Sequence, residues 1–167
     1  MLYNIDAMQE TILEFFKQFH FSKEVITLLI STLPIFELRG AIPIAVLQFN
    51  MPIAKAYILS VIGNLLPILP ILYFLEPIRK LLSKIKFMDK FFTWLYDRTY
   101  KKSKNVMKYG AIGLTLFVAI PLPVTGAWTG AVAALLFEVP PKYAFPSIIL
   151  GVLTAGVIVS LITLGFV

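Results

Sequence analysis

Two charged residues in the middle of a long apolar stretch constrain the fold of this chain more than any other feature. Glu37 and Arg39 are the only charged residues between Val25 and Phe49. A charged side chain at membrane depth is costly unless it pairs or meets water, so such residues are rare there and mark functional positions. We therefore interpret Glu37 and Arg39 as candidate functional residues. The structural alternative is a kinked spanning helix in which the two charges are neutralised by each other or by a neighbour.

Helix-breaking residues surround this pair. Pro34 precedes it, and Gly40 and Pro43 follow it. Proline lacks an amide donor and clashes with the preceding turn, so we expect no unbroken helix here. An unbroken helix of about 25 residues would measure about 40 Å, more than a bilayer core of about 30 Å requires. Two arms folded back at Glu37–Gly40 would instead form a re-entrant hairpin, which survives at membrane depth only under a cover of protein or beside a water-filled cavity.

The composition assigns the whole chain to the integral membrane class. Apolar residues make up 59% of the 167 residues and charged residues 14%, whereas a soluble domain carries about a quarter charged residues. Apolar stretches long enough to cross lipid recur along the chain. We expect residues 1–167 to form one membrane domain, small enough that it acts as a homo-oligomer. The absence of cysteine excludes disulfides, thiolate metal sites and cysteine nucleophiles.

Two segments have the pattern of amphipathic helices that rest on the membrane surface. Residues 1–22 place apolar side chains on one helical face and acidic ones opposite. Residues 76–110 hold ten of the fifteen Lys and Arg residues, Arg79 to Lys108. This basic bias indicates that the segment faces the cytoplasm and an anionic leaflet, rather than nucleic acid.

Residues 23–75, which we interpret as the first of two repeats related by the offset described below, end in a long uncharged segment. Ala56 to Leu75 carries no charge and is long enough to span a membrane. Pro67 and Pro70 predict a kink in it. Asn64 is the amide in this segment, and we expect it to form a hydrogen bond between helices rather than to contact a ligand.

The second repeat, residues 111–167, again contains a broken apolar stretch followed by a span. Tyr109 to Phe137 is uncharged for 29 residues and is interrupted at its centre by prolines and glycines, and Tyr143 to Val167 forms the final span. The residues that we expect to shape the two hairpins and line a cavity are Pro34, Gly40, Pro43, Pro121, Pro123, Thr125, Gly126, Trp128, Thr129 and Gly130.

The two halves are related by a constant offset. Adding 88 carries Pro52 onto Pro140 and Gly63 onto Gly151 without a gap, and several apolar residues match in the same register. If both broken stretches are re-entrant, the cytoplasmic basic segment places the halves in opposite orientations, an inverted repeat typical of secondary transporters. If both stretches cross fully, the halves are parallel and form four ordinary spans. We favour the inverted arrangement, because breakers at mid-depth serve no purpose in a plain four-helix bundle.

The string from Pro34 to Pro43, with its Glu-x-Arg-Gly-Ala-x-Pro core, and the later string from Pro121 to Gly126 resemble the small multidrug export family. The similarity covers the chain from about Leu28 to the C-terminus, and it extends more distantly to the DedA/VTT (SNARE-associated Golgi protein) superfamily. The resemblance implies two oppositely facing re-entrant hairpins, each beside a spanning helix, and movement of lipids or other solutes, with protons as the coupling ion. It also implies proton or substrate handling by Glu37, anion contact by Arg39, and hairpin geometry from Gly40 and Pro43.

One departure from the DedA pattern bears on the substrate. DedA proteins carry arginines in the second hairpin, whereas the stretch from Phe117 to Gly130 has none. A phosphate-headed lipid would then meet Arg39 alone within the membrane. The departure favours small amphipathic solutes over a lipid phosphate.

These observations together predict a proton-coupled, multi-pass transporter for small amphipathic solutes in the cytoplasmic membrane of a prokaryote. Its expected partners are membrane lipids, its solute and protons, with no nucleic acid, cofactor or metal. The alternatives are a DedA-like translocase of lipids or polyprenyl phosphates, a channel, and a membrane scaffold without transport. An enzyme is the weakest alternative, because the chain has one histidine, no metal-ligand cluster and no phosphate-binding loop.

Overall fold

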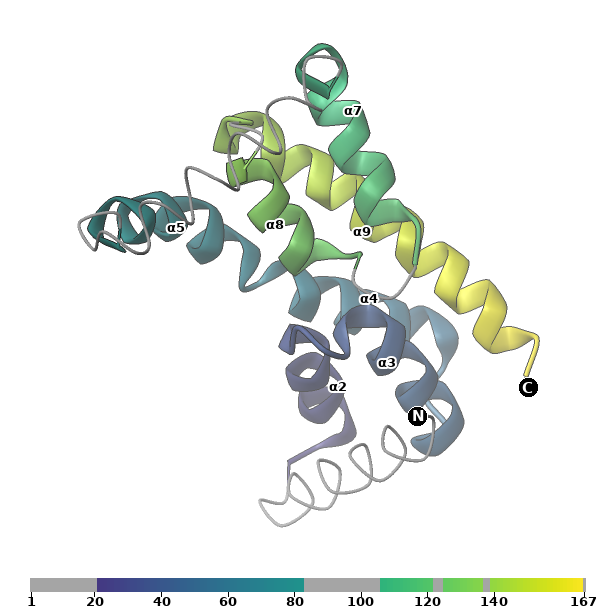
Figure 1. Cartoon of the computed structure of the whole chain (residues 1–167). Helices are drawn as coiled ribbons and strands as arrows, with labels where there is room; N and C mark the ends of the chain where they lie inside the picture. Colours follow the sequence, from purple (N-terminus) through teal and green to yellow (C-terminus); the bar gives the residue numbers. More distant parts are fainter. Residues whose placement is uncertain (1–20, 83–105, 122–124, 137–138, 167) are drawn as a thin grey trace, which may run out of the picture.

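The computed structural model describes residues 21–82, 106–121, 125–136 and 139–166, and every regular element in these ranges is a helix (Figure 1). This confirms the predicted all-helical class. The predicted amphipathic helix of residues 1–22 falls almost wholly outside the described residues. So does most of the basic segment, because residues 83–105 are not described.

The first hairpin consists of α2 (Lys23–Thr32), α3 (Glu37–Pro43) and a π-helical turn, η1 (Ile44–Gln48). Helix α2 stops because Leu33 precedes Pro34, and the proline ring pushes the preceding residue into the extended region, here ψ 133°. The expected reversal at Glu37–Gly40 is therefore wrong by a few residues. The chain turns at residues 33–36, and α3 runs through Gly40 to Pro43 without a break.

The second hairpin consists of α7 (Val106–Ala119) and α8 (Ala127–Leu136). The break between them lies at the proline-rich centre, as the sequence predicts. Thr125 stabilises this turn, because its hydroxyl donates a hydrogen bond of 2.7 Å to the carbonyl of Ile120.

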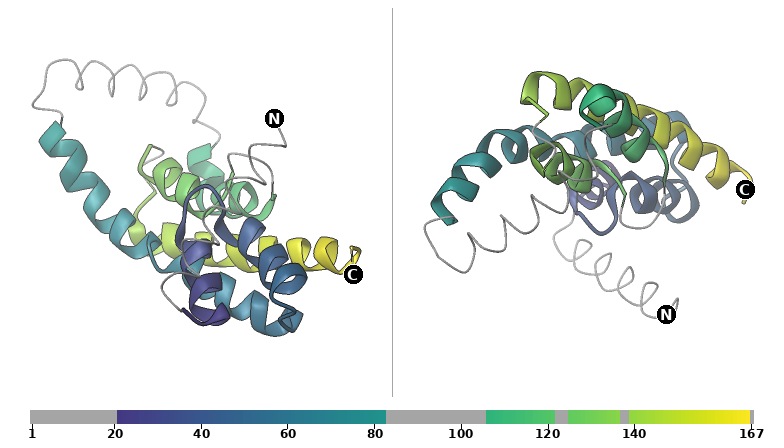
Figure 2. Two further views of the ribbon diagram at one scale, coloured as in Figure 1. Left: turned by 90° about the horizontal axis from the view of Figure 1, so that it is seen from below. Right: turned by 45° about the horizontal axis from the view of Figure 1, so that its top comes forward.

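Each hairpin is followed by a long helix. Helix α4 (Ile53–Leu65) continues, after an interruption at Leu66 and Pro67, into α5 (Ile68–Leu82), which confirms the predicted kink. Helix α9 (Pro141–Leu164) closes the chain. Two segments, Ile53–Phe74 and Pro141–Leu164, are long and apolar enough to cross a membrane. The first turns of α5 are buried, with Ile68 and Leu72 in the core, and its far end projects away from the other described helices (Figure 2).

The two long helices begin alike and pack alike. Pro52 before α4 (φ −56°, ψ 135°) and Pro140 before α9 (φ −57°, ψ 142°) have nearly the same backbone conformation. Gly63 of α4 lies directly against α2, and Gly151 of α9 lies directly against α7. A Cβ added at Gly151 would be only 2.6 Å from the Cβ of Val118. The prolines that the offset of 88 relates therefore precede the two long helices in the same conformation, and the related glycines pack against the first arm of each hairpin.

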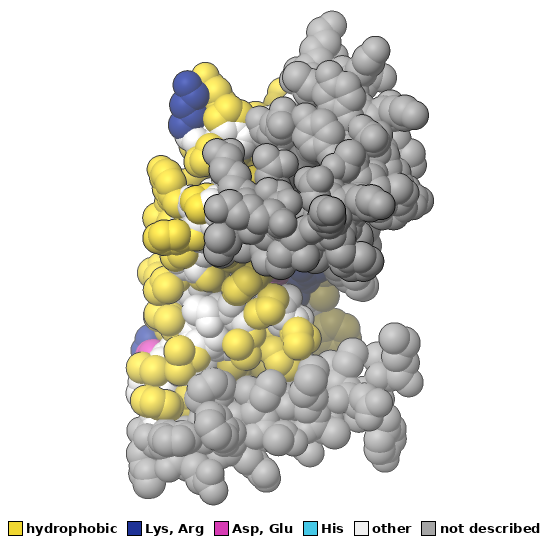
Figure 3. Space-filling model, turned by 60° about the vertical axis from the view of Figure 1, so that its left-hand side comes forward, with side chains coloured by type: hydrophobic (Ala, Val, Ile, Leu, Met, Phe, Trp, Pro, Cys, Tyr) yellow, Lys and Arg dark blue, Asp and Glu magenta, His cyan; other side chains and the backbone are white. Residues whose placement is uncertain are grey.

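The core is apolar, and so is much of the surface. The largest fully buried side chains of the main core are contributed by both hairpins and both long helices: Leu38, Ile42, Ile68, Val118, Ile148 and Val152. Large apolar side chains are also exposed along α4, α5, α7 and α9, among them Ile58, Ile62, Leu69, Phe74, Ile112, Leu116, Leu150, Val157 and Leu161. On the face shown in Figure 3, the described surface is largely hydrophobic. Exposed apolar area of this extent indicates contact with lipid.

Candidate functional site

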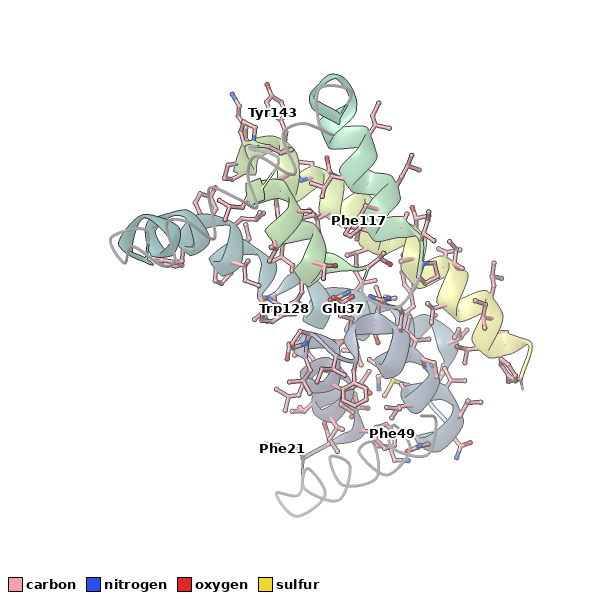
Figure 4. All side chains as sticks on the ribbon, viewed as in Figure 1. Phe21, Glu37, Phe49, Phe117, Trp128 and Tyr143 are labelled. Carbon is pink, nitrogen blue, oxygen red and sulfur yellow. The ribbon has the colours of Figure 1, made fainter. Side chains whose placement is uncertain are left out.

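The tips of the two hairpins meet at the centre of the molecule. Glu37 of the first hairpin and Trp128 of the second lie close together there, whereas Phe49 and Tyr143 lie toward opposite ends (Figure 4). The indole Nε1 of Trp128 donates a hydrogen bond of 3.0 Å to the carbonyl of Thr32, at the end of α2. A free carbonyl of the first hairpin is thus satisfied by the second hairpin.

Glu37 makes the reciprocal contact. It is the first residue of α3, is 3% exposed, and adopts a left-handed backbone with φ 48°. This conformation costs a non-glycine residue about 1–2 kcal/mol, so the surrounding contacts must maintain it. Its Oε1 accepts the main-chain N–H of Trp128 at 3.3 Å. Glu37 therefore caps the positive N-terminal end of α8, a role that a Ser, Thr, Asp or Asn next to the helix in the sequence usually fills.

Arg39 pairs with the second oxygen of the same carboxylate. Its guanidinium donates to Glu37 Oε2 at 3.0 Å, and its side chain is 24% exposed. The ion pair that the structural alternative predicts is present. The same carboxylate also binds the other hairpin, which a simple neutralised pair does not require.

Gly126 allows this close approach. It has a φ of 153°, and a Cβ at this position would collide with both the Glu37 carboxylate and the Arg39 guanidinium. Glycine is therefore required here both for its backbone conformation and for its lack of a side chain.

A small cavity adjoins the ion pair. Its volume of about 10 Å³ is enough for about one water molecule. It is lined by Glu37, Leu38, Arg39, Asn64, Val118, Gly126, Ala127, Val152 and Ala155, so α3, α4, α7, α8 and α9 all contribute.

The amide of Asn64 is 1% exposed, and neither its Oδ1 nor its Nδ2 has a hydrogen-bond partner among the described residues. The expected interhelical hydrogen bond of Asn64 is thus not formed within this part of the chain.

The predicted site residues divide into four groups. Glu37, Arg39 and Gly126 line the cavity, and Trp128 joins the hairpins. The others shape or pack the hairpins without lining the cavity. In the first hairpin, Pro34 lies in the turn, Gly40 packs against Phe36 and Pro43 ends α3. In the second hairpin, Pro121 and Thr125 lie in the turn, the Thr129 hydroxyl donates a hydrogen bond to the Gly126 carbonyl, and Gly130 packs against Val118. Pro123 lies outside the described residues.

Sequence reasoning missed the cavity role of Asn64. The available signal was an amide within an otherwise apolar span, but its distance from Glu37 could not be judged. Within the described ranges, no group of three or more His, Asp or Glu side chains is arranged to hold a metal ion.

The helical hairpins, the two long apolar helices and the exposed apolar surface define a helical membrane protein. The chain belongs to the small multi-drug export family. The family model with the description "Putative small multi-drug export protein" matches residues 37–158, from Glu37 through most of α9. No curated protein and no solved structure matches the chain. The relation to the DedA/VTT superfamily stays a prediction.

Proposed function

We propose that this protein is a multi-pass exporter of small amphipathic solutes, coupled to protons through Glu37. The observation that carries the proposal is that one buried carboxylate holds Arg39 and the N-terminus of α8 together. Membership of the small multi-drug export family supports export as the activity. We place the protein in the cytoplasmic membrane of a prokaryote, as a homo-oligomer.

Proton binding at Glu37 would loosen the contact between the hairpins. Hydrogen bonds to an ionised carboxylate are roughly twice as strong as neutral ones. When Glu37 accepts a proton, its attraction to Arg39 and to the α8 N-terminus falls, and the hairpin tips are free to separate. Loss of the proton restores the contact. A proton thereby shifts the balance between two arrangements of packed helices, which is what coupling to transport requires.

The proposed transporter has two re-entrant hairpins in an inverted repeat. The positions of Phe49 and Tyr143 toward opposite ends of the molecule support this arrangement, since each marks the region where a hairpin leads into its long helix (Figure 4). The matched proline caps of α4 and α9 support it as well. Inverted repeats of this kind place a substrate site near the middle of the membrane. The position of Glu37 at the centre of the molecule is consistent with such a site (Figure 4).

Transport by reconstituted protein tests the proposal. Wild-type protein, Glu37→Gln and the control Glu24→Gln are placed in liposomes that contain a pH-sensitive dye, and a panel of amphipathic cations and neutral amphiphiles is added. We expect solute-dependent proton movement with the wild type and none with Glu37→Gln. Glu24→Gln should behave like the wild type, because Glu24 lies in the first turn of α2 and is not among the cavity-lining residues. Equal proton movement with Glu37→Gln would refute coupling through Glu37.

An anionic, lipid-like solute is the second candidate substrate. The partial exposure of Arg39 beside the cavity favours it, because a guanidinium binds phosphate in a bidentate manner. A lipid phosphate in the same panel distinguishes the two classes. Folded protein that moves no solute of either class would favour a scaffold.

A further inference from the structure

Asn64 is buried at the site without a hydrogen-bond partner among the residues that the structure describes, which is unusual for an amide. Most buried polar side chains are paired, and each exception calls for an explanation such as a bound water. Helix α4 also holds Ser60, one turn earlier, whose hydroxyl is likewise buried and unpartnered among the described residues. Only Asn64 lines the cavity beside Glu37. Ser60 therefore serves as a control for Asn64: both are buried and unpartnered among the described residues, but only Asn64 lies at the cavity.

The groups around Glu37 suit its ionised form but not its acid form. Arg39 and the main-chain N–H of Trp128 are both donors. A protonated carboxyl group carries an O–H that requires an acceptor. Among the described residues that line the cavity, Asn64 is the one besides Glu37 whose side chain offers an acceptor oxygen. Within the described part of the chain, Arg39 is the charged group facing Glu37, and the side chains of α4, α7, α8 and α9 that line the cavity carry no titratable group.

The cavity supplies the connection between the two side chains. No direct hydrogen bond joins Asn64 to Glu37, and the space beside them is that of about one water molecule. A water there can accept the O–H of the acid and donate to the amide oxygen of Asn64. When the proton leaves, the amide can turn its NH₂ group toward the water. The ionised carboxylate already accepts hydrogen bonds from Arg39 and from the main-chain N–H of Trp128, so it depends less on Asn64 than the acid form does.

We propose that Asn64 binds the acid form of Glu37 through one water molecule and thereby stabilises the proton-loaded state of the transporter. Asn64 is then a positioning residue, since it acts on the proton through Glu37. The inference rests on the proposed function, because it assumes that Glu37 takes up a proton during transport.

The test compares Asn64→Leu with Ser60→Ala. Both changes remove an unpartnered buried polar group, which is close to neutral or stabilising when the shape is kept. For Asn64→Leu we expect the pH midpoint of solute-dependent proton movement to shift by about one pH unit toward acid, a tenfold weaker proton binding, since one hydrogen bond to the acid form is lost. For Ser60→Ala we expect no shift. Asn64→Ser keeps an acceptor and should lie closer to the wild type than Asn64→Leu.

Infrared difference spectra of the same proteins give a readout that does not depend on transport. The carbonyl band of protonated Glu37, assigned by its absence in Glu37→Gln, should move to higher frequency in Asn64→Leu and remain in place in Ser60→Ala. If Glu37→Gln abolishes the pH dependence while Asn64→Leu leaves midpoint and band unchanged, the inference is wrong and the proposed function stands. If Glu37→Gln keeps the pH dependence, the proposed function fails. In that case, a band that moves in Asn64→Leu would support contact between Asn64 and Glu37. An unmoved band would overturn that contact. Should Asn64→Leu not fold, Asn64→Ala, which also removes the acceptor oxygen, takes its place in both measurements with the same expected shifts of midpoint and band.

Discussion

The carboxylate of Glu37 accepts the main-chain N–H of Trp128, a residue 91 positions later in the chain, while the indole of Trp128 donates to the carbonyl of Thr32. Each hairpin tip therefore supplies what the other lacks. The first hairpin offers two acceptors, the Thr32 carbonyl at the end of α2 and the Glu37 carboxylate at the start of α3. The second hairpin offers two donors, both from Trp128 at the start of α8. Because both contacts join segments far apart in the sequence, the two hairpins are expected to form a single cooperative unit at this point.

Removing Arg39 should destabilise the protein more than neutralising Glu37. Arg39→Ala leaves the buried carboxylate without its ion-pair partner, a change that typically costs about 3–5 kcal/mol, reduced here if Glu37 takes a proton. Glu37→Gln keeps the side-chain shape and should remain folded. Thermal unfolding in detergent measures both, with Lys55→Ala as the control, since the Lys55–Glu24 pair is exposed.

The double variant Glu37→Leu with Arg39→Met separates structure from mechanism. If the pair only stabilises the fold, the apolar double variant should be stable and should transport with unchanged pH dependence. We expect a folded protein without coupled proton movement. Intact, pH-dependent transport by this variant would place the proton site elsewhere.

Gly126→Ala should disrupt the site, whereas Gly113→Ala should not. A methyl group at Gly126 collides with the ion pair, in a backbone conformation that side chains rarely adopt. We expect a loss of about 2–3 kcal/mol in unfolding free energy. A Cβ at Gly113 of α7 meets nothing within 4 Å, so alanine there should be neutral or stabilise the helix by up to about 1 kcal/mol. A comparable loss in both variants would contradict the role of Gly126 at the ion pair.

Cysteines at positions 50 and 140 test the topology. The native chain contains no cysteine, so Asn50→Cys and Pro140→Cys each introduce a single thiol at an exposed position. If the halves are inverted, an impermeant thiol reagent should label the two variants from opposite sides of sealed vesicles. Labelling of both from the same side would establish parallel halves.

The exposed pair at the start of the first hairpin predicts a pH effect on stability. The side-chain hydrogen bond from Lys55 lowers the pKa of Glu24, in the first turn of α2, from 4.5 to about 2. A depressed carboxyl pKa stabilises the folded state above its ordinary pKa, and this contribution is lost as the pH falls through 4.5 toward 2. Wild-type protein should therefore lose its stability advantage over Lys55→Gln across this interval. Solvent and salt screen the exposed pair, so the difference should be small and should shrink further in high salt.

The sequence alone determined the features that depend on neighbouring residues. Pro34 restricts Leu33 and so ends α2, Pro67 interrupts the first long helix, and the apolar length of α9 makes it long enough to cross a membrane. Each of these follows from local backbone sterics or from the solubility of a short segment, which the order of residues specifies directly.

Only the tertiary structure decided which groups meet at the site. The partner of Glu37 on the second hairpin and the burial of Asn64 beside them depend on how the hairpins pack. The exact position of the first turn was also missed, because Glu37 adopts a left-handed backbone that its contacts with Arg39 and α8 maintain. Such contacts are formed between segments brought together by apolar packing, and packing has no signature in the residues adjacent to the site.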